Sequence, residues 1–177
     1  MRMGTIALRC VSDHNRSGAR SITLQGQACY RDAEGTLIVL SFSACAIPHG
    51  SLITGASLIV TAAQNDERPT AFVIRGGILS PPATYPACCY VAASQVVWHL
   101  PMPWTAGSSY LAPELDAIIQ EIVSAPQWKP EYTLLLELGG DHSARQIVEY
   151  EQDLFNAARL RICFAPPENG SLAIASC

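Results

Sequence analysis

The sequence predicts an all-β fold, an antiparallel β-sandwich that carries one amphipathic helix. Short apolar runs separated by turn signals recur along the chain at the spacing typical of an antiparallel sandwich. Only one stretch has helical periodicity, whereas a parallel βαβ arrangement needs a helix between successive strands. The 177 residues suit a single domain covering residues 1–177, which is long enough to bury a sizeable core.

The predicted strands are short apolar runs bounded by polar or proline-containing turns. In the closing run RLRICF, alternation points Leu160, Ile162 and Phe164 to one side of the sheet and their neighbours to the other. A turn is expected at 47–50 and a polar loop at 64–69. The strands are expected at residues 5–11, 21–24, 36–42, 56–62, 70–75, 95–100, 132–138, 146–150, 159–164 and, more weakly, 171–175.

Residues 114–125 form the predicted helix. Pro113 suits the first helical turn, and Pro126 ends the helix because the residue before a proline is disfavoured in the α conformation. The apolar stripe is expected to lie on the β core, covering one end or edge of a sheet. Its residues follow the spacing i, i+3, i+4, i+7, i+8: Leu115, Ile118, Ile119, Ile122 and Val123.

Composition and charge narrow the classes of function. Hydrophobic residues make up 49% of the chain and charged ones only 15%, so either a partner covers some surface or the loops are polar but uncharged. A net charge of −4 without a run of Lys or Arg argues against nucleic-acid binding and against an anionic membrane surface. No stretch approaches the roughly 18 apolar residues of a membrane-spanning helix, so no membrane insertion is expected.

Cysteine usage leaves two alternatives open. The spacing contains no C-x-x-C pair, so it supports neither a zinc ribbon nor a redox motif. An odd number of cysteines leaves at least one thiol without a partner within the chain, and either buried free thiols or one or more disulfides are consistent with the pattern. The seven residues are Cys10, Cys29, Cys45, Cys88, Cys89, Cys163 and Cys177.

The order of motifs resembles a β-sandwich module of large bacterial and algal surface or secreted proteins. The helix segment PELDAIIQEIVSAPQW is similar to the module's PDLSAIIQEIVNRPGW, and LSFSACAIPHGSLITGASLIV is similar to LRFTNVTIPQGATITSAYIQF. LLLEL and ARLRI then follow as in the module, although Ala112 and Ala158 replace its Thr and Pro. The resemblance spans about residues 37–164. It implies a jelly-roll-like sandwich akin to carbohydrate-binding modules, with no catalytic residues.

No motif in the chain predicts catalysis or a cofactor. The nucleophile elbow G-x-S-x-G, paired-histidine spacings and a phosphate-binding loop are all missing from the sequence. Carboxylates for glycoside cleavage cannot be paired from sequence. Asp141 and His142 follow a Gly-Gly pair, where a plain hairpin is favoured over a metal or catalytic role. We therefore expect a protein that is not an enzyme and needs no metal or cofactor.

Aromatic residues suggest two further sites. Trp98, Trp104, Trp128 and Tyr110 are either a flat platform for sugar rings or core residues, and core packing is favoured because two of them bracket the helix. The loop 80–90 is uncharged and rich in Pro and Cys, so either it meets a neighbouring chain or it folds over the sandwich edge. Its candidate interface residues are Pro82, Tyr85, Pro86, Cys88, Cys89 and Tyr90.

Two functions follow as hypotheses. The first is a non-catalytic structural subunit of a surface assembly, such as a virion decoration or minor capsid protein or a component of an extracellular layer or filament. The alternative is a carbohydrate- or surface-polymer-binding module. The start MRMGTIALRCVSDHN lacks the features of a signal peptide, so we expect the chain to reach the surface of a particle or cell by another route, if it leaves the cell at all.

Overall fold

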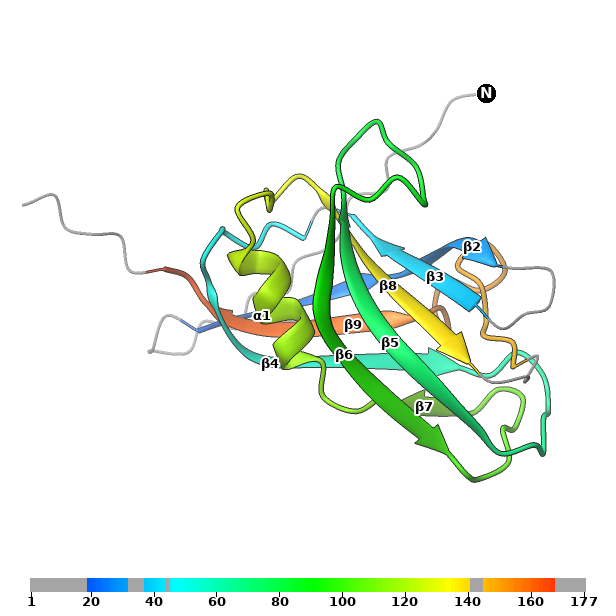
Figure 1. The fold of residues 1–177 in the computed structure, drawn as a ribbon. Coiled ribbons are helices and arrows are strands. Elements are labelled where there is room, and N and C mark those ends of the chain that lie inside the picture. The colour runs from blue at the N-terminus through cyan, green and yellow to red at the C-terminus, as the bar shows by residue number, and fades with distance from the viewer. Residues whose placement is uncertain (1–18, 32–36, 44, 141–144, 168–177) are drawn as a thin grey trace, which may run out of the picture.

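The computed structural model describes residues 19–31, 37–43, 45–140 and 145–167, and it is a β-sandwich of two antiparallel sheets with one short helix (Figure 1). One sheet has the order β1-β9-β4-β7, with β1 at Arg20–Gln25, β9 at Arg159–Ala165, β4 at Leu52–Thr61 and β7 at Ser109–Leu111. The other has the order β2-β3-β8-β5-β6, with β2 at Gln27–Arg31, β3 at Leu37–Phe42, β8 at Thr133–Gly140, β5 at Thr70–Leu79 and β6 at Tyr90–Leu100. The predicted fold class is confirmed.

The chain passes back and forth between the two sheets as in a jelly roll. Each sheet interleaves strands from the two halves of the chain, in the orders β1-β9-β4-β7 and β3-β8-β5-β6. The remaining strand, β2, extends one edge of the five-stranded sheet. The core lies between the sheets and is filled by alternate residues, as Leu160, Ile162 and Phe164 of β9 show with exposed fractions of 2% or less. The predicted direction of these three side chains is therefore confirmed.

The helix α1, Asp116–Ser124, is shorter than the predicted 114–125. The chain before it still pairs with β4, because the Leu115 amide donates to the Ala56 carbonyl at 3.0 Å. Pro113 therefore lies ahead of the helix and not in its first turn, which corrects the prediction. The predicted end of the helix is confirmed, because Ala125, the residue before Pro126, has ψ 135° and is no longer helical.

The apolar stripe of α1 packs on the sandwich as predicted, against β4, β5 and β6 (Figure 1). Ile118 and Ile122 are fully buried. They approach β5 where Gly76 stands, and a Cβ added there would lie 2.7 Å from Ile122 Cδ1 and would also collide with Ile118 Cγ2. The glycine thus lets the helix rest directly on the strand backbone.

Several predicted strands differ from the observed ones. Residues 146–150 form no strand, because the segment makes a single β-bridge, between Ile147 and Ala62 just after β4. The sequence analysis missed β2 and the three-residue β7. β4 begins four residues earlier than expected, β5 runs on to Leu79, and β6 begins at Tyr90. The expected strands at 5–11 and 171–175 lie outside the described residues.

Candidate interaction surface

The loop between β5 and β6 is folded back over the outer face of the five-stranded sheet. The rings of Tyr85 in the loop and Tyr30 on β2 lie with centroids 5.1 Å apart. The Glu137 carboxylate on β8 lies close enough to the Tyr85 hydroxyl to raise its pKa. On the same face of the sheet, Val39 and Leu135 are 0% exposed although their neighbours in the strands point to the core. The loop therefore has an inner side that packs on its own domain.

The inner side of the loop is electrically neutral. Burial, together with the nearby Glu137 carboxylate, raises the pKa of Tyr85 to about 12. Burial raises the pKa of the Cys88 thiol as well, and Glu137 adds to that rise. Because the thiolate is the reactive form of cysteine, this rise in pKa lowers the reactivity of Cys88.

The six candidate interface residues divide between two environments. Tyr85 and Cys88 are half-buried on the inner side, and the half-buried Tyr90 begins β6. The other three, Pro82, Pro86 and Cys89, are exposed. The expected tyrosine anchors thus make contacts within the chain, and only the exposed side of the loop is available to a partner. Contact of the loop with another chain remains a prediction.

A carboxylate of the helix fastens the beginning of β6. Glu121 of α1 accepts hydrogen bonds from the Ala93 and Ser94 amides at 2.6 and 2.9 Å and from the Tyr90 hydroxyl at 2.7 Å. These residues lie at or beside an irregularity in the pairing with β5, where Arg75 pairs with Gln95 and Gly77 with Val91. The donated hydrogen bonds lower the pKa of Glu121 to about 2, that of the Ala93 amide contributing most. We call this arrangement the Glu121 clamp.

The loop and β6 belong to a stretch without charge. Residues 76–113 contain no Asp, Glu, Lys or Arg. Seven large hydrophobic side chains lie exposed among the described residues, and four of them, Val91, Val97, Met102 and Leu111, fall in this stretch of about a fifth of the chain. We call the exposed residues of 76–113 the charge-free surface. The sequence analysis found the loop but missed this wider signal, which composition alone displays.

The aromatic residues near α1 belong to the core, as favoured from sequence. Trp98, Trp104 and Trp128 are 4%, 1% and 2% exposed. Tyr110 stacks on Trp104 with ring centroids 4.3 Å apart and an interplanar angle of 4°. Since the tryptophan faces are covered, these side chains offer no flat platform for a sugar ring.

A buried arginine organises the loops at one end of the sandwich. Arg145 is 1% exposed, and its Nη2 donates to the carbonyls of Arg68, Leu100 and Met102. Its guanidinium carbon lies 5.1 Å from the ring centroid of Trp104, a cation–π contact. Nε and Nη1 are buried and have no hydrogen-bond partner among the described residues. Burial lowers the pKa of Arg145, which sequence patterns did not single out.

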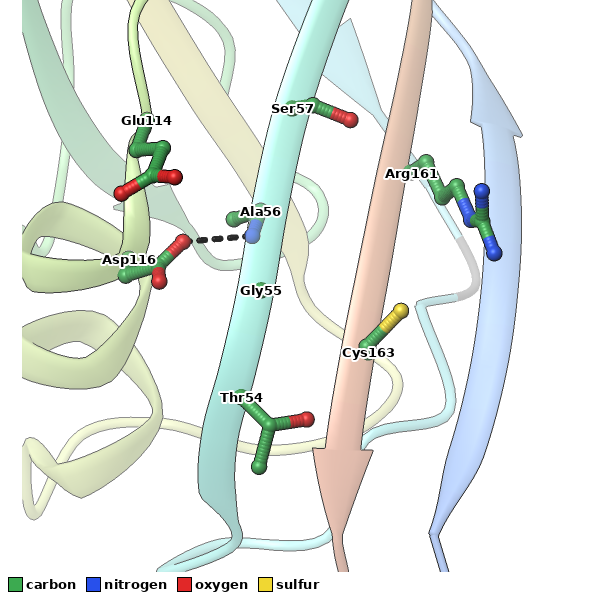
Figure 2. A pocket seen from close by; sticks show the side chains of 8 residues that line it. All are labelled: Thr54, Gly55, Ala56, Ser57, Glu114, Asp116, Arg161 and Cys163. Carbon is green, nitrogen blue, oxygen red and sulfur yellow. Dashed lines mark hydrogen bonds between the residues drawn. The ribbon is translucent and has the colours of Figure 1, made fainter. Parts of the chain in front are cut away.

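A polar hollow lies on the other sheet. It has a volume of about 320 Å³ and is bordered by β4, β9 and the segment that leads into α1 (Figure 2). Asp116 uses Oδ1 to accept the Ala56 amide at 2.5 Å, and Arg161 points away from it toward β1 (Figure 2). The remaining lining residues are Thr54, Gly55, Ser57, Glu114 and Cys163. None of the described residues that line the hollow is aromatic, so these residues provide no stacking surface for a sugar ring.

The remaining candidate residues form no site in the described part of the chain. His99 is exposed on β6, beside a hollow of about 300 Å³, and His49 is exposed in the turn that was expected at 47–50. Asp141 and His142 lie outside the described residues. No group of three or more His, Cys, Asp or Glu side chains that could hold a metal occurs among the described residues.

The cysteines that the structure describes are free thiols, and only Cys45 among them is fully buried. Burial raises its pKa to about 12. Cys10 and Cys177 lie outside the described residues. In the same part of the chain, α1 is too short to cross a membrane.

Comparisons with known proteins do not assign the chain to a family. No family model matches the chain, and no curated protein matches it. Among solved structures, eleven chains match. One of them, described as "CBM4 structure and function", is 15% identical, with 86% of this chain and 85% of that chain covered and a TM-score of 0.21. At that score the likeness carries no argument about either the fold or a binding site.

Proposed function

We propose that this protein is a non-catalytic structural subunit that works through protein–protein contacts made by its charge-free surface. The single observation behind the proposal is the concentration of exposed apolar side chains in a stretch without charge. Interface cores are depleted of charged residues, and exposed apolar side chains in an uncharged part of the chain suit such a contact. The setting that suits such a subunit is the surface of a particle or cell, as a virion decoration or minor capsid protein or as part of an extracellular layer or filament.

The energetics favour a contact at this surface. Fully burying an exposed valine contributes about 1.5 kcal/mol or more, and roughly half of that remains to be gained at Val91 and Val97, which are 56% and 45% exposed. No charged group has to be desolvated along residues 76–113, so charge desolvation offsets little of that gain. The inner side of the loop is held by Tyr85, which packs against Tyr30, and this reduces the entropy cost of ordering the exposed side against a partner.

The test adds charge to the exposed side of the loop. In the double variant Thr84→Lys/Ala87→Lys both positions are exposed, so the fold should be kept while two charges enter the proposed contact. The control Gln127→Lys/Gln152→Lys adds the same charge at exposed positions outside the charge-free surface. Native mass spectrometry of each protein, isolated from the cells that make it, reports the complex.

We expect a stoichiometric complex with other chains for the parent and for the control, and its loss for the loop variant. A parent that is isolated without any partner, or a loop variant that keeps the full complex, would contradict the proposal.

Glycan binding is the second candidate, and one observation favours it. Tyr30 is 42% exposed and lies against Tyr85, next to the carboxylate of Glu137. An exposed aromatic ring beside a carboxylate offers both a stacking surface and a hydrogen-bond acceptor for a sugar. A glycan array with the monomeric protein tests it. Binding that disappears in Tyr30→Ala but persists in Phe155→Ala, an aromatic that is 82% exposed elsewhere, would support this function over the first.

A further inference from the structure

The free edge of β6 is the least protected sheet edge in the described part of the chain. Each sheet ends in two edge strands: β1 and β7 in one, β2 and β6 in the other. β7 has three residues, β2 has five and a pairing irregularity, and the six-residue β1 carries Arg20. β6 has eleven residues, with neither charge nor proline, and its pairing irregularity lies in the first half, between Val91 and Gln95. Proteins normally protect edges by short length, charge, proline or bulges.

The two halves of β6 differ in their cover. In the first half, the Glu121 clamp occupies the Ala93 and Ser94 amides and holds α1 against the strand (Figure 1). In the second half, no hydrogen bond joins the backbone of residues 95–99 to any described element other than β5. Because backbone groups that point away from β5 have no strand partner there, this half is open to a further strand.

We infer that the second half of β6 pairs antiparallel with the same segment of a second copy of the chain. The inference rests on the proposed function and names one partner for it. A twofold axis at Val97 places Val97 opposite its own copy and Gln95 opposite His99. None of these residues carries a fixed charge, so the pairing brings no fixed like charges together. It would join the five-stranded sheets of two copies.

The side chains along this half suit such a contact. Val97 is 45% exposed, and Gln95 and His99 are exposed on the same side of the strand. In the dimer, Val97 of one chain would be covered by Val97 of the other. The exposed Met102 lies two residues after the end of the strand. A pair of short strands buries less than the roughly 1,200 Å² of a tight interface. The dimer should therefore form only as the protein concentration rises.

The test compares two valines on one strand. Val97→Lys places two ammonium groups face to face at the twofold axis, whereas Val91→Lys makes the same change at an exposed position in the half that the Glu121 clamp covers. Sedimentation of the parent and both variants is followed from about 1 µM to about 1 mM. We expect a concentration-dependent dimer for the parent and Val91→Lys, and a dimer at least tenfold weaker for Val97→Lys.

A second pair of variants tests the register if Val97→Lys fails to fold. Gln95→Glu/His99→Lys creates two opposite-charge pairs across the twofold axis and should keep or tighten the dimer. Gln95→Glu/His99→Glu creates two like-charge pairs and should abolish it. A parent that stays monomeric over the whole range, equal effects of the two valine changes, or equal effects of the two charge patterns would overturn self-pairing. None of these results bears on the complex that the loop variant Thr84→Lys/Ala87→Lys tests.

Discussion

The Glu121 clamp makes a quantitative prediction about stability. Glu121→Ala removes the acceptor for the Ala93 and Ser94 amides and for the Tyr90 hydroxyl, all held at 2.6–2.9 Å. A hydrogen bond to a charged group contributes about 1.5–3 kcal/mol when water is excluded. The carboxylate is partly exposed, so water replaces much of the loss and solvent screens the charge. We therefore expect a decrease of about 2 kcal/mol in the free energy of unfolding at pH 7.

The pKa of Glu121 also predicts how its contribution to the free energy of unfolding changes with pH. The pKa of Glu121 is about 2 in the folded chain, below the ordinary value of 4.5. Because the folded pKa is depressed, the unfolded chain binds the proton more tightly between these values. The contribution of Glu121 is therefore present above about pH 4.5 and is lost as the pH falls through 2. The difference between parent and Glu121→Ala should shrink across this window.

Urea unfolding at pH 7 and near pH 2.5 measures both effects, with Glu131→Ala as the matched control on an exposed carboxylate outside the clamp. The control should change stability by less than about 0.5 kcal/mol at either pH. An equal loss for Glu121→Ala at both pH values would refute the electrostatic reasoning. No loss at pH 7 would refute the clamp itself.

Three further predictions concern the core and one concerns metals. Ile122→Asp buries an unpaired charge under the helix and should unfold the domain, as circular dichroism would show. Gly76→Ala should cost about 2 kcal/mol or more through overpacking against Ile122, whereas Gly55→Ala, whose Cβ meets only Cys163 Cβ at 3.7 Å, should be near neutral in urea unfolding. Arg145→Ala should cost about 3 kcal/mol, because three carbonyls lose their donor. Dialysis against a chelator should leave the melting temperature unchanged; stoichiometric metal that is lost in His142→Ala would contradict this.

The parts of the fold that the sequence predicted are those with a strong local signal. β3, β5, β8 and β9 are continuous apolar or alternating runs, and the stripe of α1 has an unambiguous period. The three-residue β7 is too short to have a period, and it is a strand because it pairs with the end of β4. Residues 146–150 were predicted as a strand from their local pattern, but they form only one β-bridge, at Ile147, and are therefore not a strand.

The candidate site was predictable in composition but not in geometry. The amino-acid sequence alone shows that the loop is apolar and uncharged, and that residues 76–113 carry no charge. Which side of the loop faces the sheet depends on contacts of Tyr85 with Tyr30 and Glu137, residues far away in sequence. The Glu121 clamp is hidden for the same reason, since Glu121 reads as an ordinary polar residue on the outer face of a helix.

Hydrogen exchange in the native assembly tests the central claim most directly, by comparing the assembled protein with the dissociated chain. If the charge-free surface is a contact, amides of residues 76–113 should exchange at least tenfold more slowly in the assembly than in the dissociated chain. The exposed side of the loop and the second half of β6 should be the most affected. The strands β1, β9 and β4 beside the polar hollow should exchange at the same rate in both states. Protection confined to those strands, with residues 76–113 unchanged, would contradict the claim.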